Sequence, residues 1–438
     1  MQVATLDEDD WRPPEIGAPH VQSWRWPLHL ICVVALVAGG LALPRLHHRW
    51  EHHLPSERHH IEINLSIANI TVLGEAQRWR RPSESGLLFN MRNSRAGPAM
   101  DTACATRLIP LPEPATVAYH ITRLRPFTSL YNGSISIVHH MDLFACDKRM
   151  REPDDRECIT DSWLGDHGPC YALLWAYDKG ALAPHDLPAD AGFLVGAGTP
   201  FTTLLLQVHY QLPRPLRASE LREAGYHDTS GVVLTLASSN AKAGLRPHNA
   251  WSFEFMAYNM AIPAGATGVE YLNSLPAEQL AALVGDDLEA AQNGSLQLRQ
   301  VHAHAHHHAT RVALYRVRDG RRDVLLTVAP YCGYGECQHF YDLPDAPTIR
   351  RGDALEFVCT YDNPGREPLT YGLSAMQEMC GPIIVYTPHN PALRPHRWWY
   401  DSSEGQQRRG DGSVGDDRWV VAPSLQTSRD DFPLDRRM

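Results

Sequence analysis

Short apolar segments separated by proline and glycine make up most of the chain beyond about residue 61, and they constrain the fold more than any other feature. Ser134–Val138 alternates polar and apolar side chains with the period of a half-buried strand. Thr202–Tyr210 and Arg311–Val317 are rich in leucine, valine and tyrosine, which also favours strands. A good helical pattern occurs at Pro276–Ala291. Many short strands predict an all-β fold of packed sheets rather than alternating strands and helices.

The composition is that of an ordinary globular protein. At 438 residues, with 43% hydrophobic and 21% charged residues, the chain is long enough for two or three domains. A formal net charge of −10 and the lack of a basic stripe disfavour a nucleic-acid partner. The segment Pro213–Gly231 has the composition of a linker between two β units, and residues 391–438 form a polar tail.

An uncharged segment near the N-terminus, Trp26–Pro44, has the length of a single membrane span. The alternative is a long signal peptide that is cleaved near the small residues 38–42. The acidic leader 7–10 is not the positive start that a signal peptide carries. The arginines on either side leave the orientation undecided.

The cysteines favour an oxidising compartment for the bulk of the chain. Of nine cysteines, Cys32 lies inside the apolar segment and eight lie beyond it, an even number that suits disulfides. Four Asn-x-Ser/Thr sequons also lie beyond it, at Asn64, Asn69, Asn132 and Asn293. We therefore expect a single-pass type II protein of the secretory pathway, with a cytosolic leader (1–25), an anchor (26–44), a stalk (45–60) and a lumenal or extracellular remainder.

Three histidine clusters and one methionine carry the chemistry. They are Val-His-His-Met at 138–141, Gln-Val-His-Tyr at 207–210, His-Ala-His-Ala-His-His-His at 302–308 and Glu-Met-Cys at 378–380. Imidazole suits several transition metals, and an added thioether favours Cu(I). This donor set indicates redox copper.

The spacing within each cluster limits what it can do. Adjacent His139 and His140 point to opposite faces of a flat strand, so both reach one metal only where the strand bends or bulges. A lone histidine after an apolar run, such as His209, is more often structural than ligating. Alternate histidines from His302 to His308 share one strand face, so two of them can bind one ion. The alternative is a histidine-rich surface tract that binds metal adventitiously. Met379 by itself is typical of a core residue.

Taken together, the segments resemble the copper type II, ascorbate-dependent monooxygenases, the family of peptidylglycine α-hydroxylating and dopamine β-monooxygenases. The resemblance rests on the order and spacing of Val138–Cys146, Leu205–Tyr210, His304-Ala-His306 with Tyr315-Arg-Val-Arg318, and Glu378–Cys380 over roughly residues 60–390. It implies two copper sites. The first has His139, His140 and His209 as ligands and Gln207 close by, and the second has His304, His306 and Met379.

The choice of His304 and His306 depends on the register. The family places a Tyr-Arg-Val-Arg strand eleven residues after its first histidine, and Tyr315 then selects His304. Pairing His302 with His304 requires a two-residue insertion and is the alternative.

The resemblance further implies fold and activity. We expect two consecutive antiparallel, jelly-roll-like β-sandwich domains, at 61–215 and 216–390. The expected reaction is hydroxylation of an activated C–H carbon of a small organic or peptide substrate by O₂, with two separate coppers and with ascorbate as the electron donor. Copper at the methionine site is expected to react with O₂, and copper at the other site to supply an electron. A non-catalytic copper-binding or interaction module of the same fold is the alternative.

The substrate stays open. Peptide-amidating members carry an arginine two residues before the His-x-His pair, and asparagine and tyrosine just after Met-Cys. This chain has His302, Gly381 and Ile383 there. The groups that would clamp a peptide carboxylate are therefore missing.

The family match also implies disulfides: Cys104 with Cys158, Cys146 with Cys170, and Cys359 with Cys380. Cys332 and Cys337 remain, and we expect them to pair with each other across a short loop. So short a loop contributes the least entropy of the four bridges.

Overall fold

In the computed structural model, the residues described are 61–66, 70–72, 102–130, 136, 138–147, 150, 168–211, 226–240, 244–256, 260–333, 335–372, 377–390, 399–401, 406–408 and 420–421. The expected leader, anchor and stalk lie outside them. No helix in these ranges has the length and apolarity needed to span a membrane.

Strands β1 to β11 form what we call the first half. Their bounds are β1 (Ile61–Ser66), β2 (Ile70–Val72), β3 (Thr102–Pro110), β4 (Ala118–Phe127), β5 (Val138–Cys146), β6 (Cys170–Asp178), β7 (His185–Asp186), β8 (Ala191–Gly196), β9 (Thr203–Gln211), β10 (Tyr226–Asp228) and β11 (Gly231–Ser238).

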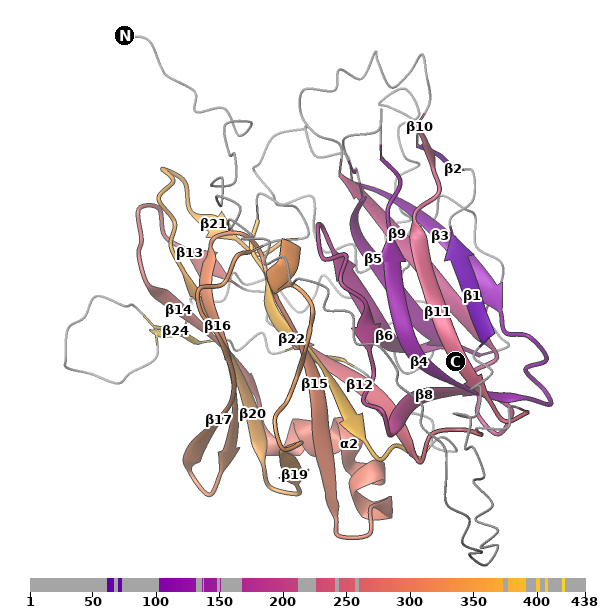
Figure 1. Ribbon diagram of the computed structural model, residues 1–438. Helices are drawn as coiled ribbons and strands as arrows, with labels where there is room; N and C mark the ends of the chain where they lie inside the picture. The colour runs from indigo at the N-terminus through magenta and orange to yellow at the C-terminus, as the bar shows by residue number, and fades with distance from the viewer. Residues whose placement is uncertain are drawn as a thin grey trace, which may run out of the picture. The chain divides into compact units, whose positions relative to one another are not determined.

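The elements from β12 onward form the second half. They are β12 (His248–Met256), β13 (Ala261–Ile262), β14 (Val269–Leu275), α2 (Ala277–Ala290), β15 (Ser295–Ala305), β16 (Ala309–Arg318), β17 (Arg321–Val328), β18 (Phe340–Asp342), β19 (Thr348–Arg350), β20 (Ala354–Tyr361), β21 (Leu369–Thr370), β22 (Cys380–Thr387), β23 (Trp399–Asp401), β24 (Gln406–Arg408) and β25 (Val420–Val421). Figure 1 shows that strands dominate both halves.

The predicted all-β class is confirmed, since α2 is the one α-helix among the described residues. The strands expected at Thr202–Tyr210 and Arg311–Val317 are β9 and β16, and the helical pattern is α2. Of the strand expected at Ser134–Val138, two residues are described: Val138 begins β5, as expected, and Ser136 lies outside a strand. The Ser136 hydroxyl accepts a hydrogen bond from the Val138 amide at 3.3 Å, a local bond that competes with strand pairing.

Three larger sheets organise the strands. One has the order β3-β9-β5-β6, and a second has the order β17-β16-β20-β14-β24-β25. The third runs β1-β11-β4-β8-β12-β22-β15-β18, with β7, β19 and β23 beside it, and so passes through both halves. The junction is a parallel pairing of β12 with β8, with His248 opposite Ala191. Beyond residue 216, β11 still pairs with β1 and β4 of the first half.

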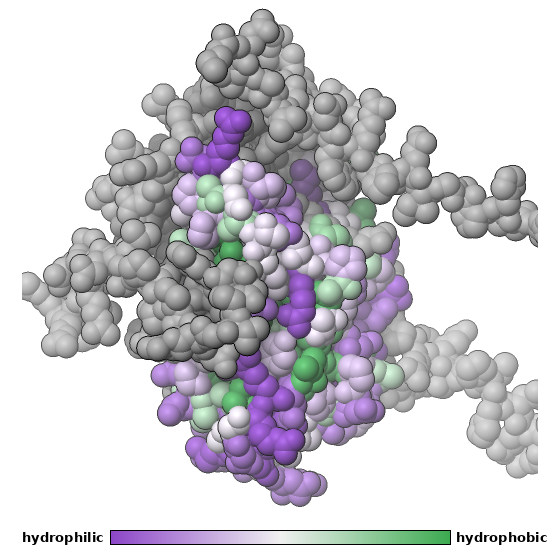
Figure 2. Space-filling model, turned by 90° about the vertical axis from the view of Figure 1, so that its left-hand side faces the viewer, coloured by the Kyte–Doolittle hydropathy of each residue, from purple (hydrophilic) through white to green (hydrophobic). Residues whose placement is uncertain are grey.

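Strand β12 also ties the halves together through its side chains. Trp251 stacks on Phe201 of the first half, with ring centroids 4.7 Å apart, and the Ser252 hydroxyl donates to the Leu173 carbonyl at 2.6 Å. One apolar core runs through both halves. Each fully buried large side chain in it contributes about 1.5 to 3 kcal/mol. The face of the second half in Figure 2 is mainly hydrophilic, and its exposed apolar residues are scattered in small patches.

Three of the four expected disulfides are confirmed. Cys146–Cys170 joins β5 to β6, Cys359–Cys380 joins β20 to β22, and Cys332–Cys337 closes a short loop after β17. The pairing expected for Cys104 and Cys158 lies outside the described side chains.

A buried polar network anchors α2 to β22 and the residues that follow it. The Asp287 carboxylate accepts hydrogen bonds from the Tyr386 hydroxyl at 2.6 Å, from Nδ1 of His389 at 2.8 Å and from the Asn390 amide at 2.8 Å. Trp251 stacks on the His389 ring at 4.6 Å. A single carboxylate therefore serves three donors in the interior.

We expect Asp287→Ala to lower the free energy of unfolding by about 2 to 4 kcal/mol, because two buried donors and one partly buried donor lose their acceptor. Urea unfolding followed by fluorescence measures the effect. Glu289→Ala is the matched control on the same helix: its ion pair with Arg351 is exposed and should contribute less than about 0.5 kcal/mol. Equal losses in the two variants would contradict the assigned role of Asp287.

Candidate metal site

The first histidine cluster is built on a β-bulge. In the pairing of β5 with β9, Val138 lies opposite Tyr210 and His140 opposite His209, so His139 is the extra residue. A bulge turns neighbouring side chains toward the same region. From the sequence, such a bend or bulge is the condition for His139 and His140 to reach one metal. The His139 and His140 rings lie 4.0 Å apart, and His209 lies 5.8 Å from the first and 5.9 Å from the second, measured between centroids. One nitrogen of each ring lies within 4.8 Å of the others.

The second cluster lies at the end of β15. Alternation places His302, His304 and His306 on one face, and all three are buried. In the pairing of β15 with β22, Ala305 lies opposite Cys380 and His304 opposite Gly381. Met379 directly precedes Cys380 in the chain, whereas His302 lies opposite Ile383, further along the ladder. His304 and His306 are therefore the histidines nearest the Cys380 end of this ladder, which Met379 precedes in the chain.

Hydrogen bonds on one ring nitrogen leave the other for a ligand. Nδ1 of His306 lies 2.7 Å from the Gln377 carbonyl, and Nδ1 of His304 lies 2.9 Å from Oε1 of Gln338. Both partners are acceptors, so both Nδ1 atoms carry protons and Nε2 is the nitrogen that can bind a metal. In the first cluster, Nε2 of His140 lies 2.7 Å from the Asp178 carboxylate, which leaves Nδ1.

The histidines are held mostly in the neutral form that metals bind. Burial lowers the pKa of His209 to about 3, and burial with neighbouring histidines holds the pKa of His139 and of His306 well below the usual range. His304 differs. Burial alone would lower its pKa, but the Asp178 carboxylate and two hydrogen bonds raise it above the ordinary value.

The two clusters adjoin one another in the structure. The His140 ring lies 5.6 Å from His304 and 6.1 Å from His306, and His139 lies 6.1 Å from His306, measured between ring centroids. The sequence predicted two separate sites and offered no distance between them. Nitrogens of His140, His304 and His306 also lie within 4.8 Å of one another.

Sequence reasoning missed two groups that hold these rings. Asp178, the last residue of β6, contacts His140, His302 and His304. An aspartate at the end of an apolar run is typical of a strand terminus, and no sequence signal pairs it with histidines more than a hundred residues away. Gln338 is the second group; its amide also donates to the Ala305 carbonyl at 2.7 Å.

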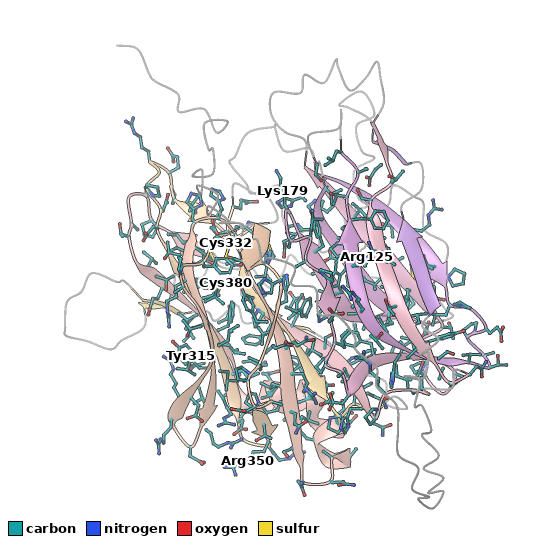
Figure 3. All side chains as sticks on the ribbon, in the orientation of Figure 1. Arg125, Lys179, Tyr315, Cys332, Arg350 and Cys380 are labelled. Atoms are coloured by element: carbon teal, nitrogen blue, oxygen red, sulfur yellow. A yellow bond between two sulfur atoms is a disulfide. The ribbon has the colours of Figure 1, made fainter. Side chains whose placement is uncertain are left out.

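Gln338 follows the loop closed by Cys332 and Cys337. The Gly335 amide of this loop donates to the Lys179 carbonyl at 2.9 Å, so the loop contacts the residue next to Asp178. Tyr331, just before the loop, donates to the Ala303 carbonyl at 2.8 Å. Figure 3 labels Lys179 and Cys332, which belong to the two segments that this contact joins.

Gln207 lies two residues before His209, on the same face of β9, and it is paired with Asp142 of β5. Its side chain is partly buried and its amide nitrogen has no hydrogen-bond partner among the described residues. It is therefore placed beside the first cluster, where a group that contacts a ligand or its surroundings is expected.

Two further acids lie near the clusters. Burial raises the pKa of Asp142 to about 6, and burial together with Asp142 raises the pKa of Glu254 on β12 to about 7. For Glu254 the folded-state pKa lies above the ordinary value of 4.5. The folded protein therefore binds the extra proton between these values, and its stability falls as the pH rises from about 4.5 to about 7.

We expect Glu254→Gln to remove the loss of stability that ionisation of Glu254 causes at high pH. The metal-free variant should match the parent near pH 5 and exceed its free energy of unfolding at pH 8 by on the order of 1 to 3 kcal/mol, below the full value because the side chain keeps some exposure. Denaturant unfolding at both pH values, with the exposed Glu367→Gln as control, measures it. Parallel pH profiles for Glu254→Gln and parent would refute it.

Comparisons with known proteins identify both halves. The family model "Copper type II ascorbate-dependent monooxygenase, N-terminal domain" matches residues 89–216, and the model of the C-terminal domain of the same family matches residues 287–394. Together they cover more than half of the chain. The six residues predicted as ligands fall inside these segments.

Several curated proteins are similar to more than half of the chain. Mouse peptidyl-glycine alpha-amidating monooxygenase is 28% identical over 58% of the chain and 23% of its own length. Human DBH-like monooxygenase protein 1 is 26% identical over 62% of the chain and 42% of its own length. Rat dopamine beta-hydroxylase is 28% identical over 58% of the chain and 39% of its own length. The match thus spans less than half the length of each of these relatives.

Proposed function

Because the chain belongs to the copper type II, ascorbate-dependent monooxygenase family, we propose that it is an oxidoreductase that hydroxylates an activated C–H carbon of a small organic or peptide substrate with O₂. The family uses copper and ascorbate. Two coppers per chain and electrons from ascorbate are therefore part of the proposal.

The observation that carries the proposal is that the required donors converge from distant parts of the chain. Two imidazole clusters and the segment of a buried methionine meet between β5, β9, β15 and β22. The proposed ligands are His139, His140 and His209 for one copper, and His304, His306 and Met379 for the other. Neutral imidazoles fit copper, and the thioether favours its reduced form.

Bound copper would supply the one-electron chemistry that activates O₂. The residues of the chain fix the donors: Asp178, Gln338 and the Gln377 carbonyl each orient an imidazole from behind. Burial of His139, His209, His304 and His306 keeps bulk water from these rings. Glu378, buried next to Met379, lies 2.9 Å from Nδ1 of His308 and fixes the methionine segment to the end of the histidine tract.

Three positions bear on the substrate. His302 faces Asp178 at 3.0 Å, and Ile383 packs in the core. A Cβ on Gly381 would lie 2.8 Å from Cε of Met256 and 3.0 Å from the Phe255 carbonyl, so this position has no room for a larger side chain. None of the three offers a clamp for a peptide carboxylate, which favours a substrate without one.

Anaerobic copper titration of the purified chain, followed by ascorbate-driven oxygen uptake, tests the proposal. We expect two coppers per chain, and uptake that is stimulated more by phenethylamine than by a glycine-extended peptide. Two bound coppers without ascorbate-driven uptake with either compound would favour a non-catalytic copper-binding module instead.

The finer architecture belongs to the same proposal. We propose two jelly-roll-like sandwiches, with the predicted division near residues 215 and 216, carried on a type II anchor at residues 26–44. In sealed microsomes a C-terminal tag should be protected from protease and an N-terminal tag digested; the reverse pattern, or a mature N-terminus near residue 40, would overturn the anchor. Asn293 is exposed in the turn after α2, so its sequon should carry a glycan that endoglycosidase removes.

A further inference from the structure

Asp178 is the group that the two histidine clusters have in common. Its side chain is 1% exposed. One carboxylate oxygen lies 2.7 Å from Nε2 of His140, and the other lies 3.0 Å from Nε2 of His302 and 3.3 Å from Nδ1 of His304. His140 belongs to the first cluster, and His302 and His304 belong to the second.

A buried carboxylate requires partners, because taking an unpaired charge from water is costly. Asp178 has three ring nitrogens within 3.3 Å, which approach from two strands, β5 and β15. Its backbone is fixed from the other side, since the Ala181 amide donates to the Asp178 carbonyl at 2.9 Å and Gly335 binds the adjacent Lys179 carbonyl. The carboxylate is thus held at one position between the clusters.

The contacts decide which nitrogen each ring presents. When Nε2–H of His140 donates to Asp178, only Nδ1 of that ring can bind a metal. When Nδ1–H of His304 donates to Asp178 and Gln338, only Nε2 can. A carboxylate behind a metal-binding imidazole also raises its basicity.

We propose that Asp178 is a positioning residue shared by the two copper sites, which orients His140 in one and His304 in the other. This inference rests on the proposed function only for the identity of the metal. It assigns no contact between Asp178 and the metal or the substrate. His302, whose Nε2 lies 3.0 Å from the same carboxylate, is a further contact that keeps the carboxylate in place.

The test separates the two sites. Cu(I) affinity is measured anaerobically by competition with bathocuproine disulfonate, in a Met379→Ile background for the first site and in a His209→Ala background for the second. Asp178→Asn is then added to each. Asparagine keeps the shape but replaces one acceptor oxygen with an NH₂ group that meets an imidazole N–H. We expect Cu(I) binding to weaken about 10- to 100-fold in both backgrounds, the usual effect of losing such a partner.

Asp228→Asn is the control for a purely structural effect. Asp228 is fully buried in the first half and accepts from the hydroxyls of Ser129 and Ser230 at 2.5 Å and 2.6 Å. Its substitution should lower the melting temperature of the metal-free protein and leave both copper constants within about twofold of the parent. Equal weakening of copper binding by Asp228→Asn and Asp178→Asn would overturn the proposal.

The remaining outcomes are also decisive. If Asp178→Asn weakens Cu(I) binding in one background alone, or in neither, the shared role of Asp178 is refuted. The proposal that the parent chain binds two coppers would be unaffected by that result. Two coppers and a shared Asp178 effect without hydroxylation would refute the proposed function and leave this inference intact. If Asp178→Asn does not fold, Asp178→Glu replaces it, because one extra methylene displaces the carboxylate and should weaken both sites in the same way.

Discussion

Replacing Met379 with isoleucine is expected to leave a folded protein that binds one copper instead of two and shows no ascorbate-driven oxygenation. The side chain is 8% exposed and isoleucine is of similar size, so the stability loss should be below about 1.5 kcal/mol. The Met379 carbonyl, which accepts from the Tyr361 hydroxyl at 2.6 Å, is retained. Loss of the only proposed sulfur donor should lower turnover by more than about 100-fold, since loss of an outer partner alone costs 10- to 100-fold.

X-ray absorption of the reduced protein and copper analysis provide the measurement. A Cu–S component should be present in the parent and absent in Met379→Ile. Met150→Ile is the matched control, because Met150 is also 8% exposed but packs near Cys170 of the first half. A reduced parent without a sulfur component would refute the monooxygenase assignment, and loss of that component in Met150→Ile would refute the choice of Met379.

The second large effect is a contrast between two histidines on one strand face. His306→Ala should remove the copper of the second site and abolish oxygenation, because His306 adjoins the Met379 segment and contacts the Gln377 carbonyl. His302→Ala should keep two coppers, with affinity reduced by about 10- to 100-fold at most, because His302 contacts Asp178 instead.

Copper analysis after dialysis against a weak chelator distinguishes the two variants. Unfolding curves should show that both remain folded, which excludes general loss of structure. If His302→Ala loses a copper and His306→Ala retains two, the alternative pairing of His302 with His304 is correct.

The sequence predicted the all-β fold class, and its local patterns named candidate donors whose role as ligands stays a prediction. Tyr315 selects His304 by spacing alone, and the pairing of Ala305 with Cys380 brings the segment of Met379 to the end of the strand that carries His304. The condition that His139 and His140 require a bulge is met by the β5–β9 register. These features depend on neighbours in the chain or on one ladder of hydrogen bonds.

Features that depend on contacts between distant segments were not predictable. Nothing in the Leu-Leu-Trp-Ala-Tyr run before Asp178 indicates that its carboxylate meets His302, because that contact exists only once β6 and β15 are packed. The parallel pairing of β8 with β12, which carries one sheet through both halves, is likewise set by tertiary structure. At Ser136 the expected strand is not formed, and the hydroxyl of this serine accepts a hydrogen bond from the Val138 amide.

The Cys332–Cys337 bridge shows that thermal stability is a poor measure of what a disulfide does. Its ends are five positions apart, so it restrains the unfolded chain less than the bridges with separations of 21 and 24, and cutting it should hardly change a melting curve. Yet Gln338, which contacts His304, directly follows this loop, and Gly335 within it contacts Lys179. A mild reductant should therefore impair metal retention at temperatures where the protein is still fully folded. A preparation that lacks this bridge alone would therefore pass tests of foldedness and still lack part of its copper.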